Sequence, residues 1–309
     1  MNLKQLETFV RVAELGSFSK AAVVLDTAQP ALSRQVRLLE TDLRVTLLER
    51  TGRGVVLTEA GKRLLEHSIG ILQLVARARD DIQASRDEPV GRLVVGMPPS
   101  VGRQLTLRLV EAFGRECPKA RLAIVEGLSA HIVEWIATGR VDLGLVHNPE
   151  PNEAIETEPV LDELLCLVSA APARGGAPGR PVALKDLPKY PLVIPERSHA
   201  VRRLLETQAA LAGIKLDIAW EVSGVPAMLD LVAGGYGHAV LTAGAVGAEV
   251  TAGRLSVRPI GGPPLVNTLC IARPANKRAT PLARHVTRLL RELVSATGPA
   301  QVPGDADRR

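Results

Sequence analysis

Apolar residues recur at steps of three and four in the N-terminal part of the chain, which is the spacing of an amphipathic helix. The run 29–40 is the clearest case, because apolar and polar side chains fall on opposite faces of the predicted helix. Thr27 is expected to cap this helix, with Pro30 in the first turn, where a missing N–H breaks no helical hydrogen bond. The apolar face consists of Leu32, Val36, Leu39 and Leu43, and the polar face of Gln29, Ser33, Arg34 and Arg37.

The polar face of this helix carries the side-chain types that bond base edges and phosphates in the major groove of DNA. An ordinary surface helix with two solvated arginines would show the same pattern, so these residues alone leave both interpretations open. Residues 19–25 predict a second short helix, joined to the first by only residues 26–28. Two short helices on a tight turn favour a helix-turn-helix, and DNA binding with it.

Two more elements belong to this N-terminal unit. Asn2 is placed to cap a first helix that Gly16 ends, and its apolar stripe is expected to pack under the helix-turn-helix. Residues 47–57 predict a hairpin with Arg53 between two glycines at its tip. Such a tip can be a plain turn, but beside a helix-turn-helix it is typical of a wing that brings an arginine to DNA.

The sequence of this unit resembles that of the LysR-type transcriptional regulators. The stretches GSFSKAA at 16–22, QPALSRQ at 29–35 and LERTGRGVVLTEAG at 48–61 carry the resemblance, which continues more weakly along the chain. Ala28 is a departure, because many members have Ser or Thr there, and it puts a hydroxyl contact in doubt. The resemblance implies a regulator that binds double-stranded DNA and acts with RNA polymerase. The DNA-binding residues would be Gln29, Pro30, Ser33, Arg34, Arg37 and Arg53.

Beyond Thr58 the apolar spacing of four and three continues and predicts one long helix over 59–88. Its narrow seam has the period of a coiled coil, which favours pairing of two chains over a helix lying along its own domain. The resemblance agrees, since the family's linker helix pairs two subunits and presents two recognition helices to a partly palindromic operator. A homodimer or homotetramer is expected. The predicted seam is Leu64, Ser68, Ile71, Val75, Ala78 and Ile82, with all but Ser68 assigned to the dimer contact.

After Pro89 the pattern changes to short apolar runs that alternate with helical stretches, which predicts a largely parallel α/β sheet. The resemblance implies a fold like that of the periplasmic type 2 binding proteins, with two subdomains and a ligand cleft between them. The predicted strands lie at 91–96, 121–125, 141–146, 164–168, 192–194, 219–222, 239–241 and 266–272, and a closing helix at 282–294.

The expected fold class is therefore α/β, with an N-terminal winged helix-turn-helix, a long linker helix and a C-terminal periplasmic-binding-protein-like (type 2) effector domain of two α/β subdomains. The loop at 170–181 and the last residues are expected to be flexible. The predicted domains are 1–58 for DNA binding (helix-turn-helix at about 18–37), 59–88 for the linker and dimerisation helix, 89–300 for effector binding (subdomain I at about 91–163 and 266–296, subdomain II at about 164–265) and 298–309 for the tail.

Polar residues follow several predicted strands, where a cleft between subdomains would lie. Ser100 and Gly102 open a helix after the first strand, so free N–H groups and a hydroxyl could hold an anion there. Ser129 repeats this arrangement after the second strand. Either serine could instead be only a helix cap, although effector sites of the family often use Ser or Thr at the position of Ser100. Three residues after later strands could equally be solvated. The predicted effector-binding residues are Ser100, Gly102, Ser129, His147, Arg197 and His199.

The net charge of +5 does not by itself indicate DNA binding, because residues 1–90 contain 13 basic against 12 acidic residues. The placement of arginines on one surface matters more than their number. Aromatic residues make up 2% of the chain, which disfavours a single-strand binder that stacks bases on rings. No apolar run approaches the roughly 20 residues of a membrane helix, and no secretory signal is recognisable. A cytoplasmic protein without a membrane contact is expected.

The chemistry of metals, redox and catalysis has little support in the sequence. Cys117, Cys166 and Cys270 are widely spaced and predict buried, reduced thiols rather than a redox switch. The six histidines form no cluster with metal-ligand spacing, so neither a metal site nor a cofactor is expected. Residues 127–131 faintly resemble a nucleophile elbow, but the final glycine is absent and no acid and base are placed. We therefore expect no catalytic residues and no enzyme.

Two alternatives of other classes fit the α/β part alone. One is an enzyme, and the other is a cytoplasmic solute-binding protein, for which the cleft fold would be suitable. The helix-turn-helix at the N-terminus argues against both, since neither function needs it. A turnover assay or periplasmic fractionation would separate them from a cytoplasmic DNA-binding protein.

Overall fold

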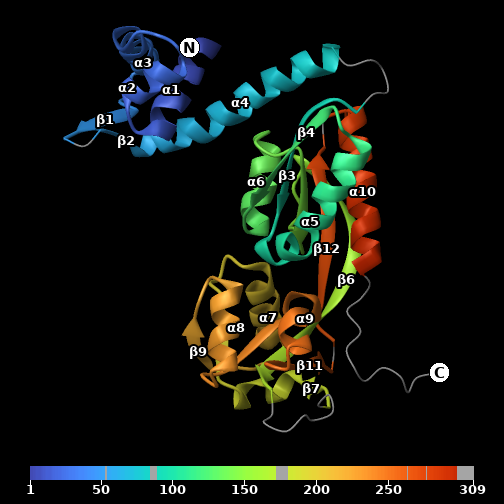
Figure 1. Ribbon diagram of the computed structural model, residues 1–309. Helices are drawn as coiled ribbons and strands as arrows, with labels where there is room; N and C mark the ends of the chain where they lie inside the picture. Colours follow the sequence, from blue (N-terminus) through green and yellow to red (C-terminus); the bar gives the residue numbers. More distant parts are fainter. Residues whose placement is uncertain (53, 84–88, 172–179, 263, 276, 298–309) are drawn as a thin grey trace.

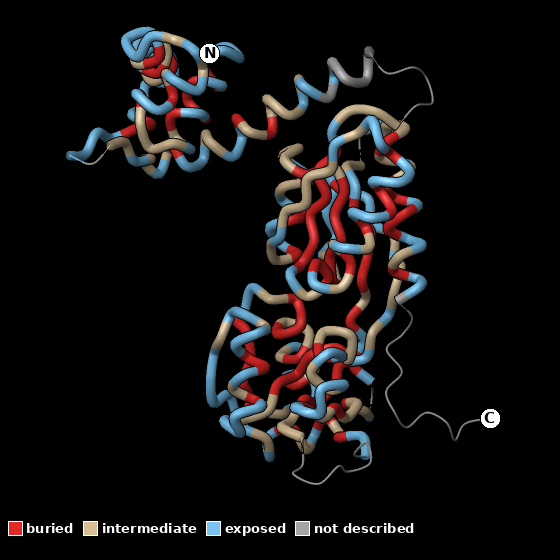
Figure 2. Tube along the Cα trace, viewed as in Figure 1, coloured by how far each residue is buried: buried red, intermediate tan, exposed pale blue. Residues whose placement is uncertain are grey.

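The computed structural model has a small helical unit at the N-terminus, a long helix that leaves it, and an elongated α/β part in two halves (Figure 1). Figure 2 shows that buried residues line the middle of each half and the inside of the helical unit. The structure describes residues 1–52, 54–83, 89–171, 180–262, 264–275 and 277–297, without the side chains of 77, 79–83 and 297. Most of the predicted flexible loop at 170–181 lies outside these residues. The predicted tail at 298–309 lies outside them entirely.

The helical unit has the predicted three helices and hairpin. Gln5 donates its backbone N–H to the Asn2 side chain and accepts from the Asn2 N–H in return, which is the predicted capping box. Gly16 ends the first helix at a φ of 59°, in the left-handed region. The elements are α1 (Leu3–Leu15), α2 (Phe18–Val24), α3 (Gln29–Leu43), β1 (Leu48–Thr51) and β2 (Gly54–Leu57), and β1 and β2 pair antiparallel.

Helix α3 begins at Gln29, as predicted, but its N-cap differs from the predicted one. Ala28 is its N-cap and offers no side-chain bond, whereas the Thr27 hydroxyl donates to the Leu25 carbonyl at 3.0 Å. The prediction of a Thr27 cap is therefore wrong, because that hydroxyl closes the turn between α2 and α3 instead. The apolar stripe is buried at Leu32, Val36 and Leu39, but Leu43 at the helix end is 37% exposed.

Helix α4 (Glu59–Gln83) leaves this unit as a single long helix. Its first turns pack against the core that α1, α2 and α3 share (Figure 1). Within the described residues, the Ser68 hydroxyl is buried without a hydrogen-bond partner in this contact. The α4 residues that pack against the core are Ala60, Leu64, Leu65, Ile69, Ile71 and Leu72.

The first half of the α/β part is a sheet covered on both faces. Its core on one side lies under α5 and α10, and on the other side under α6. The elements are β3 (Gly91–Met97), α5 (Pro99–Glu116), β4 (Ala120–Glu126), α6 (Ser129–Ala137), β5 (Leu143–His147), the first part of β6 (Ile155–Ala170), β12 (Val266–Pro274) and α10 (Pro281–Thr297).

The second half has the same layered arrangement, with α7 on one face of its sheet and α8 and α9 on the other. Its elements are the second part of β6, β7 (Val182–Ala183), a 3-10 helix (Leu184–Lys189), β8 (Leu192–Ile194), α7 (Ala200–Leu211), β9 (Ile218–Glu221), α8 (Val225–Ala233), β10 (His238–Thr242), α9 (Ala243–Thr251) and β11 (Leu255–Gly261).

The two halves share one sheet in the order β4-β3-β5-β12-β6-β10-β8-β9, with β11 beside β6. The outer strands of each half pair in parallel, but β6 and β12 are antiparallel to each other and to β5 and β10. The sheet is thus mixed rather than largely parallel, because two long strands carry the chain between the halves. Charged residues at 156, 158 and 162 interrupt the apolar pattern of β6, so the sequence predicted only its second part.

The three cysteines are free and buried, as predicted, and burial raises the pKa of each thiol, most strongly at Cys166, to about 11. A thiol with a raised pKa carries little thiolate near neutral pH, which is the unreactive state. Of the helices that the structure describes, none has the length and apolar character needed to cross a membrane.

Candidate nucleic-acid interface and ligand cleft

The polar face of α3 is open to solvent, with four predicted residues exposed and one half-buried. The core takes the opposite face, so α3 turns these side chains away from the protein. A helix that projects arginine and glutamine side chains beyond its domain can enter a major groove and bond base edges. The exposed residues are Gln29, Pro30, Arg34 and Arg37, and the half-buried one is Ser33.

Contacts from α2 and β1 fix the rim of this face. The Arg50 guanidinium donates to the Ser33 hydroxyl at 3.0 Å and lies 5.3 Å from the centre of the Phe18 ring. The Ser19 hydroxyl donates to the Gln29 side chain at 3.1 Å. Arg50 therefore belongs to this surface, although it was absent from the predicted set. Arg53, which was in that set, lies outside the described residues.

The predicted dimer seam of α4 is not open to a partner chain along its whole length. Leu64 and Ile71 pack against the core of their own helical unit, because tertiary packing turns that side of α4 inward. Val75 is half-buried and Ala78 exposed, while the side chain of Ile82 is outside the described residues. The outward stripe of α4 consists of His67, Leu74 and Ala78, and Leu74 is 52% exposed. Leu74 was missed in the sequence although its spacing to Ala78 is helical.

Helix α4 also contacts the first half of the α/β part. A Cβ added to Gly70 would come within 2.2 Å of the Thr138 carbonyl oxygen, so the two backbones pass close together. With its amide nitrogen turned toward them, Gln73 donates to the carbonyls of Gly139 and Arg140 at 3.1 and 2.7 Å. These residues form the turn at the end of α6. The linker helix is thereby attached to the turn between α6 and β5.

Ser100 and Gly102 line a cavity of about 630 Å³ between the first turns of α5 and the helices α8 and α9 of the other half. Ser100 is not a helix cap, because Pro98 takes that place without a side-chain bond. The N–H groups of Val101 and Gly102 both donate to the Pro98 carbonyl, which leaves fewer free donors than predicted. The Glu126 carboxylate also lies beside Gly102 and faces the positive end of α5.

Ser129 and His147 meet in a buried polar cluster. The Ser129 hydroxyl accepts from the His147 backbone N–H at 2.9 Å, so Ser129 joins α6 to β5 and is not a cap. The His147 ring nitrogen Nδ1 lies 2.9 Å from the Asn267 amide nitrogen, and the Asn267 oxygen accepts from Asn148 at 2.8 Å. Burial, with a smaller repulsion from His199, lowers the pKa of His147 to about 4. The ring is therefore neutral near pH 7.

His199 approaches this cluster but Arg197 does not. His199 caps α7 through a 3.4 Å bond from the Val201 N–H, and burial together with Arg203 lowers its pKa. The side chain of Arg197 is 81% exposed and lies 3.8 Å from Glu206. The predicted set thus divides into a cavity pair (Ser100 and Gly102), a buried cluster with His199 beside it, and one solvated arginine.

Glu163 and Gln104 connect the cavity pair with the buried cluster. Glu163 is the register partner of Asn267 across β6 and β12, so the two side chains share a face of the sheet. Its carboxylate and the Gln104 amide both lie near Gly244 of α9, and Gln104 donates to the Ser100 carbonyl at 3.3 Å. Burial raises the pKa of Glu163, against a hydrogen bond from Thr242. Both residues were missed, because strand pairing alone brings them here.

Comparison with known proteins identifies the family of the helical unit and of the α/β part. Residues 3–62 match the model of the bacterial regulatory helix-turn-helix protein, lysR family, and residues 86–295 match that of the LysR substrate binding domain. The chain belongs to the LysR family. Its resemblance in the recognition helix and wing is thus confirmed, and it is a LysR-type transcriptional regulator with an α/β effector-binding domain.

Relatives of this LysR-type protein match along almost its whole length. HTH-type transcriptional regulator BbuR of Bordetella bronchiseptica is 31% identical over 94% of this chain and 88% of its own. The crystal structure of CbnR, a LysR family transcriptional regulator, matches at a TM-score of 0.70 and 27% identity, covering 96% of this chain and 99% of CbnR. Full-length CbnR complexed with its target DNA matches at a TM-score of 0.55 and 28% identity, covering 95% and 100%.

Proposed function

We propose that this LysR-type regulator binds a partly palindromic operator by placing α3 in the major groove. The single observation that carries this proposal is the exposed face of α3, whose rim Arg50 holds through Ser33. Arg34 and Arg37 have the geometry to bond guanine edges or phosphates, and Gln29 to bond adenine. Arg53 is proposed as a backbone or minor-groove contact on sequence grounds. CbnR, a member of the family, has been solved in complex with its target DNA, which supports DNA binding by this chain.

The operator-binding species is proposed to be a homodimer or a tetramer built from dimers. The support is the outward stripe of α4, where Leu74 exposes about half of its surface in the middle of a long helix. Pairing two such stripes would bury Leu74 and Ala78 and hold two copies of α3 at a fixed spacing. The proposed units are accordingly 1–58 for DNA binding, 59–88 for pairing and 89–300 for effector binding.

The effector is proposed to be a small organic monoanion that also carries a hydrogen-bond donor, as a hydroxy or amino carboxylate does. Ser100 offers its hydroxyl to the carboxylate, and the first turn of α5 adds its positive end. Glu126 lines the same cavity, and its carboxylate disfavours a second negative charge on the ligand. The carboxyl oxygens of Glu163, which lies close to this cavity, are acceptors that suit a donor on the ligand.

Helix α6 could transmit the effect of ligand binding to the DNA-binding unit, because its two ends contact different parts of the protein. Ser129 at its start belongs to the buried cluster, and the turn at its end receives Gln73 of the linker helix. An effector that binds the closed cleft better than the open one shifts the population between them, and α6 would pass that shift to α4. The two copies of α3 would then change their spacing and the bend of the operator.

Selection from a pool of randomised DNA duplexes tests DNA recognition and identifies the preferred operator in the same experiment. The full chain is expected to enrich a motif with two related half-sites, spaced by about one helical turn or a multiple of it. The double variant R34A/R37A should enrich no motif at the same salt concentration. Enrichment of the same motif by both proteins would remove α3 from the interface. Cytoplasmic location and contact with RNA polymerase are further parts of this proposal.

A further inference from the structure

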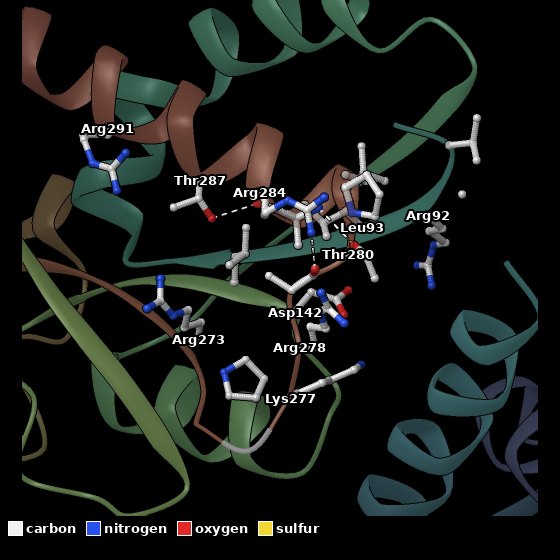
Figure 3. Close-up of a pocket in the computed structure, with 18 residues that line it drawn as sticks. Arg92, Leu93, Asp142, Arg273, Lys277, Arg278, Thr280, Arg284, Thr287 and Arg291 are labelled. Carbon is white, nitrogen blue, oxygen red and sulfur yellow. Dashed lines mark hydrogen bonds between the residues drawn. The ribbon is translucent and has the colours of Figure 1, made fainter. Parts of the chain in front are cut away.

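A second cavity lies at the end of the first half that is remote from Ser100. It has a volume of about 260 Å³ and is bordered by the start of β3, the start of β5, the loop after β12 and the first turns of α10 (Figure 3). The effector cleft follows the ends of β3 and β5, whereas this cavity precedes their beginnings. The two sites therefore lie at opposite ends of β3 and β5, and one molecule of the proposed effector cannot occupy both.

The wall of this cavity is strongly basic. Six cationic side chains line it, and the one carboxylate in its described wall is that of Asp142, which accepts from the Val94 N–H at 2.9 Å. Arg273 and Arg291 are each paired at 2.8 Å with a glutamate of β6. Among the described residues, the cations of this cavity thus outnumber the carboxylates that line it or pair with its arginines. The cationic residues are Arg92, Arg273, Lys277, Arg278, Arg284 and Arg291 (Figure 3).

Two of these arginines lack a partner within the part of the chain that the structure describes. The side chains of Arg92 and Arg278 make no hydrogen bond or ion pair with another described residue, and both are exposed. The Arg284 guanidinium donates to the Ala279 carbonyl at 2.8 Å, a contact that leaves its charge unneutralised. The positive side chains of this cavity repel each other, and a bound anion would reduce that repulsion.

The first turn of α10 adds to this field. Thr280 caps the helix by accepting from the Ala283 N–H at 3.1 Å, and the positive end of this long helix therefore borders the cavity. Guanidinium groups bind phosphate oxygens in pairs of parallel hydrogen bonds. A phosphate has enough oxygens to bond several guanidinium groups at once, whereas a single carboxylate has only two. The volume lies just below the range of about 300–1,000 Å³ typical of ligand pockets and suits a compact ligand.

We infer that this cavity is a second ligand site, which binds a small multivalent anion of the phosphate-ester class between Arg92, Arg278 and the start of α10. The site goes beyond the proposed effector cleft, which suits one negative charge. Its position gives it access to the linker, because Arg92 stands in β3 directly after the linker segment and α4 contacts β3. A ligand bound here would change the packing of the linker helix α4 against β3, and operator binding would change with it.

Titration of the full chain with inorganic pyrophosphate by calorimetry, at constant ionic strength, tests this inference. Saturable binding is expected, and R92A/R278A should weaken it by about tenfold to a hundredfold, since each substitution removes a charge-assisted partner. R197A is the matched control, because Arg197 is an exposed arginine of the second half, away from this cavity. R34A controls for binding of pyrophosphate to the DNA-binding face. Both controls should bind pyrophosphate like the wild type.

The outcomes are separable. Equal affinity in R92A/R278A and the wild type would overturn the assignment, and so would a loss of equal size in R34A. Equal heat from sulfate at the same ionic strength would reduce the effect to general screening, and tighter binding of citrate would overturn the phosphate class. The variant R92K/R278K keeps the charges but not the paired donors, so it should bind with intermediate affinity. Circular dichroism of each variant confirms that it is folded.

Discussion

At the residue scale, Arg34 has an open side chain on the exposed face of α3. Replacing it by alanine should weaken binding to the selected duplex by about 1–3 kcal/mol if it contacts a base, and should relax the sequence preference there. R53A should instead mainly lower the dependence of affinity on salt, as expected of a phosphate contact. Anisotropy titrations at several salt concentrations separate the two effects. R11A is the control, and unchanged specific affinity in R34A would exclude Arg34.

The neutral state of His147 predicts a pH dependence of stability. Its folded pKa of about 4 lies below the ordinary histidine value of 6.5, so the unfolded chain binds a proton first as the pH falls. Stability is thus full above about pH 6.5 and is lost toward pH 4, by about 2 kcal/mol between pH 7 and pH 5. Urea unfolding should show a shallower loss in H147Q. His131 is exposed, so H131Q should keep the wild-type slope, and equal slopes in all three proteins would contradict the assignment.

The exposed and buried faces of α3 could be predicted from the sequence because helical periodicity is a local property. The roles of Ser129 and Glu163 could not. Ser129 has the pattern of a helix cap, and only the fold brings the His147 N–H to its hydroxyl. Glu163 meets Asn267 through strand pairing across a long stretch of chain. A residue whose partner is remote in the sequence leaves no local pattern, so such a contact cannot be predicted from the sequence alone.

At the element scale, α4 illustrates the same limit. Its length and apolar spacing were predictable, but its rotation depends on which stripe the helical unit buries, and that unit takes Leu64 and Ile71. The long strands β6 and β12 are a similar case. Charged residues at 156, 158 and 162 interrupt the apolar pattern of β6, so that pattern understated the length of the strand and did not show its antiparallel pairing.

The outward stripe of α4 predicts which substitution breaks the dimer. L74D would bury a charge opposite its own copy, and should raise the dimer dissociation constant by about a hundredfold. A76D places the same charge on an exposed position of the opposite side of α4 and should remain dimeric. Sedimentation velocity at low protein concentration compares them. Dimers of L74D that persist there would assign dimerisation to the effector-binding domain.

At the scale of the whole molecule, α6 and α4 form the proposed link between the cleft and DNA. The Ser100 hydroxyl has no hydrogen bond to another described residue, whereas the Ser129 hydroxyl accepts a buried N–H. S100A should therefore keep its stability but lose about tenfold in affinity for the hydroxy or amino carboxylate that most raises the wild-type melting temperature. S129A should lose about 1–3 kcal/mol of stability.

Thermal denaturation and ligand titration of both variants distinguish these outcomes. A full ligand response in S100A would move the effector site away from the first turn of α5. A further measurement follows the signal to the DNA. Q73A lacks the contact between the linker helix and the turn after α6, so it should bind the same ligand but respond to it with a smaller change in operator affinity.

The central claim is that a paired regulator places two copies of α3 on two half-sites of one operator. The most direct test compares the affinity of the full chain for the selected duplex with its affinity for the same duplex after one half-site is scrambled, at a single salt concentration. Scrambling is expected to weaken binding by at least about tenfold, because a dimer then loses the base contacts of one α3. Equal affinity for the two duplexes would contradict the claim.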